Sequence, residues 1–325
     1  MSSDSAKEIE LEVRNLCKYF PVKHKGVLKA VDHVSFQIQR GETLGIVGES
    51  GCGKTTCGKT CIGMYEPQSG EVLYQGKNIH KMSKKERFEL TSKVQMIFQD
   101  PYASLDPHQK VYDIIAEGMR IHKLVSNQSE EEKKVMELLE MVGLSAEHAN
   151  RNVHEFSGGQ RQRIGIARAL SVEPEFLFCD EPISALDVSI QAQIVNLLER
   201  LKEERNLTML FIAHDLSMVK HISDKIGVMY LGNMVEMSSA ADLYKNPYHP
   251  YTEALLSAVP IADPDVAKTK REFSFKEMFQ VRSIRQKDAV FVDVAAKVLD
   301  ICHETCPELK EISKDHWVAC HLYDE

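Results

Sequence analysis

The chain has 325 residues, 43% of them hydrophobic and 27% charged, which is the composition of an ordinary globular protein with room for one large domain and a smaller appended one. No window approaches about 18 uninterrupted apolar residues, and the acidic, polar start MSSDSAKEIELEV contains no obvious secretory signal, so neither a membrane span nor a leader is expected. The formal net charge of −8 argues against nucleic acid as the main partner.

The N-terminal part has the alternation of apolar and polar residues that is typical of half-buried strands. The runs 9–14 and 31–38 predict two strands of an antiparallel sheet, and residues 71–74 predict a short third one. Between them, the apolar run 43–47 predicts a fully buried strand.

The middle of the chain alternates between helical and strand patterns. Residues 111–154 have helical periodicity, with a charged run at 129–134 that is best explained as a solvated helix face. Strands are then expected at 176–180 and 208–213, separated by a helix over 190–205. The expected fold class is therefore α/β, with a mostly parallel core sheet covered by helices, an antiparallel β subdomain and a helical subdomain at about 105–155. We expect one large domain over residues 1–260 and a C-terminal extension over 261–325.

The stretch 48–55, Gly-Glu-Ser-Gly-Cys-Gly-Lys-Thr, matches the phosphate-loop pattern G-x-x-x-x-G-K-[ST] at every fixed position. Glycines let the backbone curl so that its N–H groups face phosphate oxygens, Lys54 supplies a positive charge, and the Thr55 hydroxyl is suited to Mg²⁺. The alternative, a glycine-rich turn without a ligand, is disfavoured by the strand before the motif and the helix expected after it. The residues expected to bind the phosphates and their metal are Gly48, Ser50, Gly51, Cys52, Gly53, Lys54, Thr55 and Thr56.

Four polar residues follow apolar strands of the expected sheet. Asp180 and Glu181 end one strand, and Gln99 and His214 end two others. Asp180 and Gln99 are expected to help Thr55 hold Mg²⁺, while Glu181 is placed to polarise an attacking water. Each residue alone has a structural explanation, but four such strand ends in one sheet indicate a catalytic site.

Together with Ser157, Gly158, Gly159 and Gln160, these motifs make residues 8–260 resemble the ATP-binding cassette (ABC) ATPases. The resemblance implies a Walker A loop at Lys54 and Thr55, a Q-loop at Gln99, and a Walker B strand ending at Asp180. It also implies that Glu181 is the general base, that His214 is the switch histidine, and that Ser157–Gln160 is the signature which binds a second subunit's ATP.

The same resemblance implies three further assignments. The residues Ser184 to Asp187 form the D-loop, and Phe20, or less favourably Tyr19, stacks on the adenine. Phe156 stands where the family usually has leucine before the signature; because that position packs into the helical subdomain, the exchange is expected to be harmless. Two subunits then close head to tail on ATP, and the helical block docks a membrane partner's coupling helix.

Two longer stretches narrow the resemblance to the importer ATPases for oligopeptides, dipeptides and nickel. These are residues 99–107, QDPYASLDP, and 246–252, NPYHPYT. We interpret the second stretch as a turn before a capped helix, which bears on family and not on chemistry. The resemblance implies a second ATPase subunit, two permeases and an extracytoplasmic solute-binding protein as partners, and a peripheral location at the cytoplasmic face of the membrane.

The eight cysteines fall into two groups. Five of them are best explained as reduced, mostly buried thiols of a cytosolic protein: Cys17, Cys52, Cys57, Cys61 and Cys179. The other three are Cys302, Cys306 and Cys320. In the importer branch four tail cysteines often bind an iron–sulfur cluster, but here the first pair is missing from 263–301, so a cluster is in doubt. A zinc site that includes His316 and His321, or a tail without metal that folds by packing, are the alternatives.

The leading hypothesis is the ATP-hydrolysing subunit of a peptide importer, with nickel or another small solute as variants. A soluble ABC ATPase that acts on nucleic acid or ribosomes is the rival from another class. The single uninterrupted cassette, the acidic balance and the stretch at 246–252 disfavour it. An exporter is disfavoured by the importer-type tail and by the lack of fused membrane spans.

Overall fold

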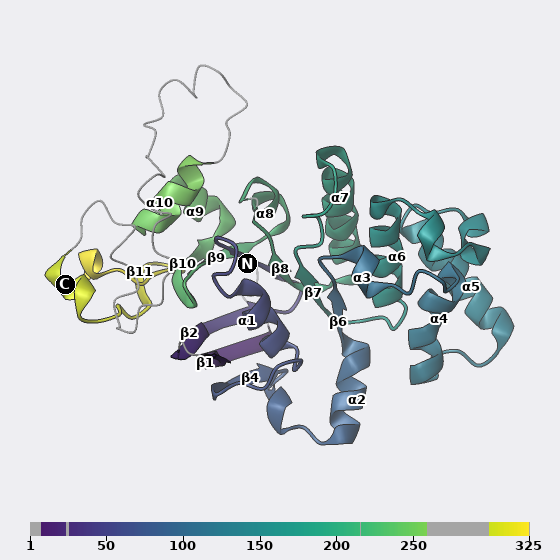
Figure 1. Ribbon diagram of the computed structural model, residues 1–325, viewed down its shortest axis with the longest axis horizontal. Helices are drawn as coiled ribbons and strands as arrows, with labels where there is room; N and C mark the ends of the chain where they lie inside the picture. Colours follow the sequence, from purple (N-terminus) through teal and green to yellow (C-terminus); the bar gives the residue numbers. More distant parts are fainter. Residues whose placement is uncertain (1–7, 24–25, 215, 259–298, 325) are drawn as a thin grey trace, which may run out of the picture.

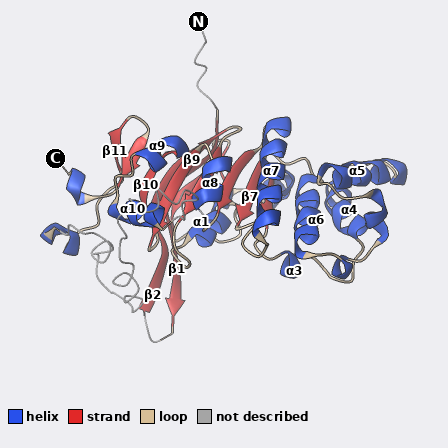
Figure 2. Ribbon diagram, turned by 90° about the horizontal axis from the view of Figure 1, so that it is seen from above, coloured by secondary structure: helices blue, strands red, loops and turns tan. Residues whose placement is uncertain are grey.

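The structure is a computed structural model that describes residues 8–23, 26–214, 216–258 and 299–324 (Figure 1). Within these residues the strands form two sheets, a larger one with the order β11-β12-β10-β9-β3-β8-β7-β6 and a smaller one with the order β2-β1-β4-β5. The larger sheet runs through the middle of the molecule, the β1–β2 hairpin projects from it, and a group of helices lies at the end beyond β6 (Figure 2).

The larger sheet has a parallel core. Strand β3 pairs in parallel with β8 and β9, and β7 pairs in parallel with β6 and β8, whereas β10, β12 and β11 continue the sheet antiparallel. Its strands are β3 (Thr43–Val47), β6 (Val94–Ile97), β7 (Phe176–Asp180), β8 (Thr208–Ile212), β9 (Lys225–Tyr230), β10 (Asn233–Ser239), β11 (Lys310–Ser313) and β12 (His316–Val318). Every residue of β3, β7 and β8 is buried, as expected for strands covered on both faces.

The smaller sheet is antiparallel, as predicted, but its first two strands are longer than their sequence pattern indicates. Its strands are β1 (Ile9–Val22), β2 (Gly26–Gln39), β4 (Ser69–Tyr74) and β5 (Lys77–Asn78). Strands β1 and β2 pair from Ile9 opposite Gln39 to Val22 opposite Gly26, with four register shifts between Ile9 and Tyr19. These shifts break the strict alternation of buried and exposed residues, so the sequence pattern ends although the strand continues.

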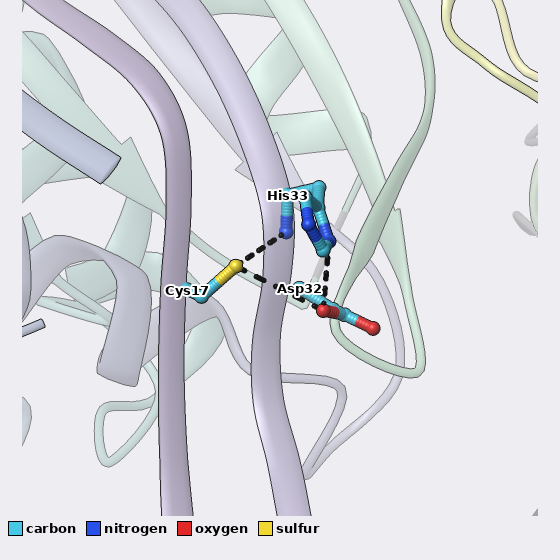
Figure 3. A group of neighbouring side chains, drawn as sticks. All are labelled: Cys17, Asp32 and His33. Atoms are coloured by element: carbon cyan, nitrogen blue, oxygen red, sulfur yellow. Dashed lines mark hydrogen bonds and ion pairs between the residues drawn. The ribbon is translucent and has the colours of Figure 1, made fainter. Parts of the chain in front are cut away.

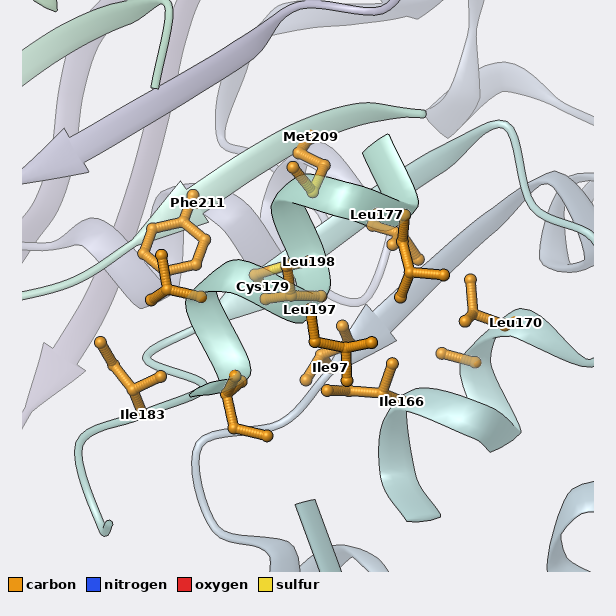
Figure 4. Close-up of a cluster of buried hydrophobic side chains, with 14 of the residues drawn as sticks. Ile97, Ile166, Leu170, Leu177, Cys179, Ile183, Leu197, Leu198, Met209 and Phe211 are labelled. Atoms are coloured by element: carbon orange, nitrogen blue, oxygen red, sulfur yellow. The ribbon is translucent and has the colours of Figure 1, made fainter. Parts of the chain in front are cut away.

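Helices cover the sheets and build the helical subdomain. They are α1 (Lys54–Cys61), α2 (Lys84–Lys93), α3 (Pro101–Ser104), α4 (Val111–His122), α5 (Gln128–Met141), α6 (Gly158–Leu170), α7 (Val188–Arg205), α8 (Leu216–Ile222), α9 (Ala240–Lys245) and α10 (Pro250–Ser257). Helices α6 and α7 join the helical subdomain to the sheet, because Ile166, Leu170 and Leu197 pack with Leu177 and Phe211 in one buried cluster (Figure 4). No helix in the described ranges has the length and apolar character needed to cross a membrane.

Two strands of the C-terminal tail, β11 and β12, belong to the larger sheet. Strand β12 pairs with β10 through Glu236 opposite Val318, and β11 pairs with β12. Both strands are short, and neither they nor β9 and β10 were predicted from the sequence. The charged segment 263–301 lies almost entirely outside the described residues.

Candidate nucleotide-binding and catalytic site

The phosphate loop follows β3 and leads into α1, as the motif predicts. Gly48 and Gly53 have φ values of 149° and 110°, which side chains rarely adopt. An added Cβ would lie 2.2 Å from the Met229 carbonyl oxygen at Gly48 and 2.0 Å from the Ala30 carbonyl oxygen at Gly53. The two glycines therefore let the loop lie directly against the backbone of β9 and β2.

The loop is also held by hydrogen bonds from outside the motif. The Gly232 N–H, in the turn between β9 and β10, donates to the Cys52 carbonyl oxygen at 2.8 Å. The Glu49 N–H donates to the Tyr251 hydroxyl at 3.0 Å. Residues more than 170 positions later in the sequence thus fix the shape of the loop.

Lys54 is the first residue of α1, and its side chain folds back over the loop. Its Nζ donates to the carbonyl oxygens of Gly48 at 2.7 Å and Glu49 at 2.9 Å, and lies 3.7 Å from Cys52 Sγ. The residue is only 3% exposed. A buried ammonium group at the mouth of a glycine-rich loop is suited to bind the outer phosphates of a nucleotide.

Thr55 and Asp180 come together although they are far apart in sequence. The Thr55 hydroxyl donates to Asp180 Oδ1 at 2.6 Å, and Lys59 Nζ lies 3.7 Å from Oδ2. Burial raises the pKa of the Asp180 carboxyl, and the Thr55 hydrogen bond and the Lys59 charge only partly offset this. A hydroxyl and a carboxylate oxygen in contact are hard ligands that fit Mg²⁺. The predicted metal pair is thus brought together.

Glu181 is the centre of a second cluster. Gln99 Nε2 donates to its Oε2 at 2.6 Å, and His214 Nε2 contacts its Oε1. The residue is 5% exposed and has a positive φ of 46°, a strained conformation that aims the side chain and is common at functional sites. Gln99 thus contacts the expected base and not Asp180, its predicted partner in holding Mg²⁺.

The electrostatic surroundings keep the Glu181 carboxylate ionised. Burial by itself would raise its pKa, but the hydrogen bond and charge of His214, the charge of Lys54 and the Gln99 hydrogen bond outweigh burial and lower the pKa. Glu181 is therefore in the form needed to accept a proton from water at neutral pH.

The signature stretch begins α6. The Ser157 hydroxyl accepts from the Gln160 N–H at 3.4 Å while Gln160 Oε1 accepts from the Ser157 N–H at 3.1 Å, which is a complete capping box. At Gly159 an added Cβ would lie 2.6 Å from Ile190 Cγ2, so glycine lets α6 approach α7 closely. Helix α6 is well separated from α1 in both views (Figures 1 and 2).

Phe156 packs into the helical subdomain as predicted, and the expected D-loop residues lie in an exposed turn. Phe156 is 4% exposed and packs in the core of the helical subdomain, with the Arg151 guanidinium over its ring. Ser184 and Asp187 are exposed in the turn between β7 and α7, where Ser184 Oγ donates to the Glu181 carbonyl oxygen at 3.1 Å.

The two candidate adenine-stacking residues, Phe20 and Tyr19, differ in their side-chain contacts. The Tyr19 hydroxyl is hydrogen-bonded to Asp32, whereas the Phe20 ring is half-buried and meets Tyr65 edge-on with ring centroids 5.8 Å apart. Lys18 Nζ lies 5.0 Å from the Phe20 centroid. This arrangement favours Phe20 over Tyr19.

A group not predicted from the sequence, Cys17, Asp32 and His33, lies on the β1–β2 hairpin (Figure 3). His33 Nδ1 is 2.9 Å from Asp32 Oδ1, and the His33 N–H donates to Cys17 Sγ at 3.3 Å. It is the sole set of three such side chains at mutual metal-binding distance among the described residues. However, the Lys29 ammonium lies 3.0 Å from Asp32 Oδ2, and this charge opposes a bound cation.

The tail residues do not fit a metal centre. His316 is fully buried and places both ring nitrogens on carboxylates, with Nε2 at 2.7 Å from Glu236 and Nδ1 at 2.9 Å from Asp242. The ring nitrogens of His321 contact Asp324 and the Thr305 carbonyl oxygen, both in the tail. Cys302, Cys306 and Cys320 form no group of three ligands among the described residues. The suggested iron–sulfur or zinc site is therefore not supported.

The chain is similar to known proteins in both its cassette and its C-terminal region. Residues 31–184 match the ABC transporter family model, and residues 235–277 match the model for the oligopeptide/dipeptide transporter C-terminal region. The chain is 61% identical over 311 residues to the oligopeptide transport ATP-binding protein OppF of Bacillus subtilis, covering 95% of each chain. It is 49% identical to AppF of the same organism over 98% of each chain, and 45% identical to OppF of Haemophilus influenzae over 98% of this chain and 99% of that protein.

Solved structures give the same result for the fold. CbiO1 of Clostridium perfringens, part of the ABC transporter complex CbiONQ, matches with a TM-score of 0.65 and 28% identity over 74% of this chain and 92% of its own. The ATP-binding cassette MJ0796, as a dimer bound to ADP and phosphate, matches with a TM-score of 0.65 and 26% identity over 71% of this chain and 98% of its own. The chain therefore belongs to the ABC ATPases, in the branch of oligopeptide transport ATP-binding proteins.

Proposed function

We propose that this chain hydrolyses ATP to energise the import of oligopeptides through a membrane permease. The observation that carries the proposal is the pairing of Thr55 with Asp180 beside the Glu181 cluster, in a chain 61% identical to an oligopeptide transport ATP-binding protein. The names of the relatives favour oligopeptides over nickel and over nucleic acid or ribosomes.

Each group of the site has a defined task in this proposal. Lys54 and the loop N–H groups bind the phosphates, and Phe20 stacks on the adenine. Thr55 and Asp180 would hold Mg²⁺, which neutralises charge on the phosphates during hydrolysis. Glu181 takes a proton from the attacking water, His214 and Gln99 orient its carboxylate, and in-line attack then breaks the terminal phosphate bond.

The exposed signature and D-loop residues supply the conformational step. Ser157 and Asp187 are exposed, and a second cassette closing head to tail would bring its signature to this chain's ATP. The proposed partners are that second ATPase subunit, two permeases that contact the helical subdomain, and an extracytoplasmic solute-binding protein. The chain then sits peripherally at the cytoplasmic face of the membrane.

Replacement of the native chain by Glu181→Gln in its own cells tests this proposal. We expect uptake of a labelled oligopeptide to stop while membrane association of the variant persists, because closure without hydrolysis cannot reset the permease. Uptake of an unrelated amino acid is the control. Unimpaired oligopeptide uptake would contradict the proposal.

A further inference from the structure

The importer-type stretch 246–252 contacts the phosphate loop directly. Tyr251, near the start of α10, is fully buried, and its hydroxyl accepts the Glu49 N–H at 3.0 Å. Its ring also packs on Tyr230 at the end of β9, with centroids 4.5 Å apart. The stretch interpreted from sequence as a turn before a helix therefore lies behind the loop that binds phosphate.

This contact fixes one particular peptide unit. The Glu49 N–H and the Gly48 carbonyl belong to the same planar peptide group, and in a trans peptide they point in opposite directions. The carbonyl oxygen accepts from Lys54 Nζ at 2.7 Å, while the N–H donates to Tyr251. Tyr251 thus sets the orientation of the peptide group on which the Lys54 ammonium rests.

Glu236 on β10 holds the start of α10 in place. This carboxylate is fully buried and accepts the backbone N–H groups of Tyr248 at 2.8 Å and His249 at 2.9 Å. His249 Nδ1 in turn accepts the Tyr251 N–H at 3.1 Å and caps the helix. The position of Tyr251 therefore depends on the position of Glu236.

The C-terminal tail completes the arrangement. His316 on β12 contacts Glu236 Oε1 at 2.7 Å, and the Tyr323 hydroxyl donates to the Tyr248 carbonyl oxygen at 3.1 Å. Hydrogen bonds therefore run without interruption from the tail through Glu236 and α10 to the phosphate loop.

We propose that Tyr251 is a positioning residue for the phosphate loop and that the tail, through His316 and Glu236, holds Tyr251 in place. This inference rests on the proposed role of the loop in binding ATP. It gives the tail a task in nucleotide binding that requires no metal.

Tyr251→Phe in the full chain tests the first step, because it removes one hydroxyl and keeps the buried ring. We expect the Kd for MgATP to rise about 5-fold to 30-fold, as for a hydrogen bond lost at a single buried donor. Amide exchange in residues 48–54 should accelerate, and kcat at saturating ATP should change much less than the Kd.

Tyr74→Phe is the matched control, because Tyr74, at the end of β4, is 4% exposed and its hydroxyl donates to Glu175 at 3.3 Å, away from the phosphate loop. Tyr74→Phe should lower the thermal stability of the chain, but it should leave the Kd for MgATP and the amide exchange in residues 48–54 unchanged. If Tyr251→Phe behaves like this control, the inference is wrong.

His316→Ala tests the second step, with His321→Ala as its control. His321 is 9% exposed and contacts Asp324 and Thr305, which are both in the tail. Only His316→Ala should accelerate exchange in residues 48–54, and equal effects of both variants would overturn the role of the tail. If the alanine variant does not fold, His316→Gln, which keeps one donor toward Glu236, should show the same change at smaller size.

Lys54→Ala separates this inference from the proposed function. If Lys54→Ala abolishes ATP binding and Tyr251→Phe does not alter it, the positioning role fails alone. If Lys54→Ala leaves ATP binding intact, the proposed role of the loop fails as well.

Discussion

His214 Nε2 contacts Glu181 Oε1 at the carboxyl ends of the neighbouring strands β8 and β7. Gln99 holds the other carboxylate oxygen at 2.6 Å. The carboxylate of the proposed general base is therefore oriented from two sides.

Glu181→Gln should reduce ATP turnover by about 10²-fold to 10⁴-fold, the usual contribution of a general base, and should leave ATP binding intact. The amide has nearly the same shape and can still contact Gln99 and His214, but it cannot accept the proton of water. Turnover, ATP affinity and the ATP-dependent appearance of a dimer measure the effect. Undiminished hydrolysis would rule out Glu181 as the base.

His214→Ala should lower turnover and move the acidic limb of the pH–rate profile to higher pH. His214 lowers the pKa of Glu181, while burial raises it, so loss of the imidazole leaves burial less opposed and the carboxylate protonates at higher pH. The exposed His221 on α8 gives the control variant, His221→Ala. An acidic limb at the same pH in both variants would contradict the pairing.

Lys54→Ala should abolish tight ATP binding, measured by equilibrium titration. The Lys54 ammonium is the one buried cation that bonds to the loop carbonyls of Gly48 and Glu49 in the described structure. Lys59→Ala, which alters the charge near Asp180 instead, is the comparison and should weaken binding less. Tight binding by the Lys54 variant would show that the loop does not hold the phosphates.

The His316 pairing should make stability depend on pH. Burial lowers the pKa of His316, but Glu236 and Asp242, the carboxylates that contact its ring, outweigh burial and raise it. A raised pKa means that the stabilisation is complete below the unfolded value of about 6.5 and is lost as the pH rises through the folded pKa. The ring of Tyr248, with its centroid 4.7 Å away, completes the surroundings.

At pH 6 the variant His316→Ala should therefore have a free energy of unfolding about 1–3 kcal/mol lower than that of the native chain. The loss should stay within this range because Glu236 still accepts two backbone N–H groups after the substitution. The difference should narrow as the pH rises. Thermal unfolding at several pH values measures it, and a difference that grows with pH would show that His316 does not gain its stability from the charged form.

The purified chain should contain neither zinc nor iron in stoichiometric amount, and Cys302→Ser should leave its visible absorption unchanged. The reason is that His316 is committed to carboxylates and the tail cysteines form no ligand set among the described residues. Elemental analysis of protein prepared without air provides the measurement. A visible band that disappears with Cys302→Ser would contradict this prediction.

The parts of the site that are determined by a local sequence pattern could be predicted from the sequence alone. The loop 48–55 is recognisable because its glycines, Lys54 and Thr55 must lie in one short stretch between a buried strand and a helix. Asp180, Glu181, Gln99 and His214 could be found because parallel strands end at the same edge of a sheet.

The contacts that support the site could not be predicted in the same way. Tyr251 reaches Glu49 through the path of the chain along β9, β10, α9 and α10, and no local sequence pattern predicts that path. Strands β11 and β12 are too short for periodicity to show, and their place beside β10 depends on the buried pair of Glu236 and His316. The Gln99 side chain was predicted to hold Mg²⁺, but its orientation toward Glu181 is set by packing and not by sequence.

The most direct test of the whole account is purification of the tagged Glu181→Gln chain from its native membranes in mild detergent with ATP, followed by identification of the proteins that co-elute. We expect two multi-span membrane proteins and a second cassette ATPase, in a complex that loses none of them on washing. Recovery of the chain alone, or with nucleic acid or ribosomes, would contradict import as its function. Only the proposal that the chain hydrolyses ATP would then remain.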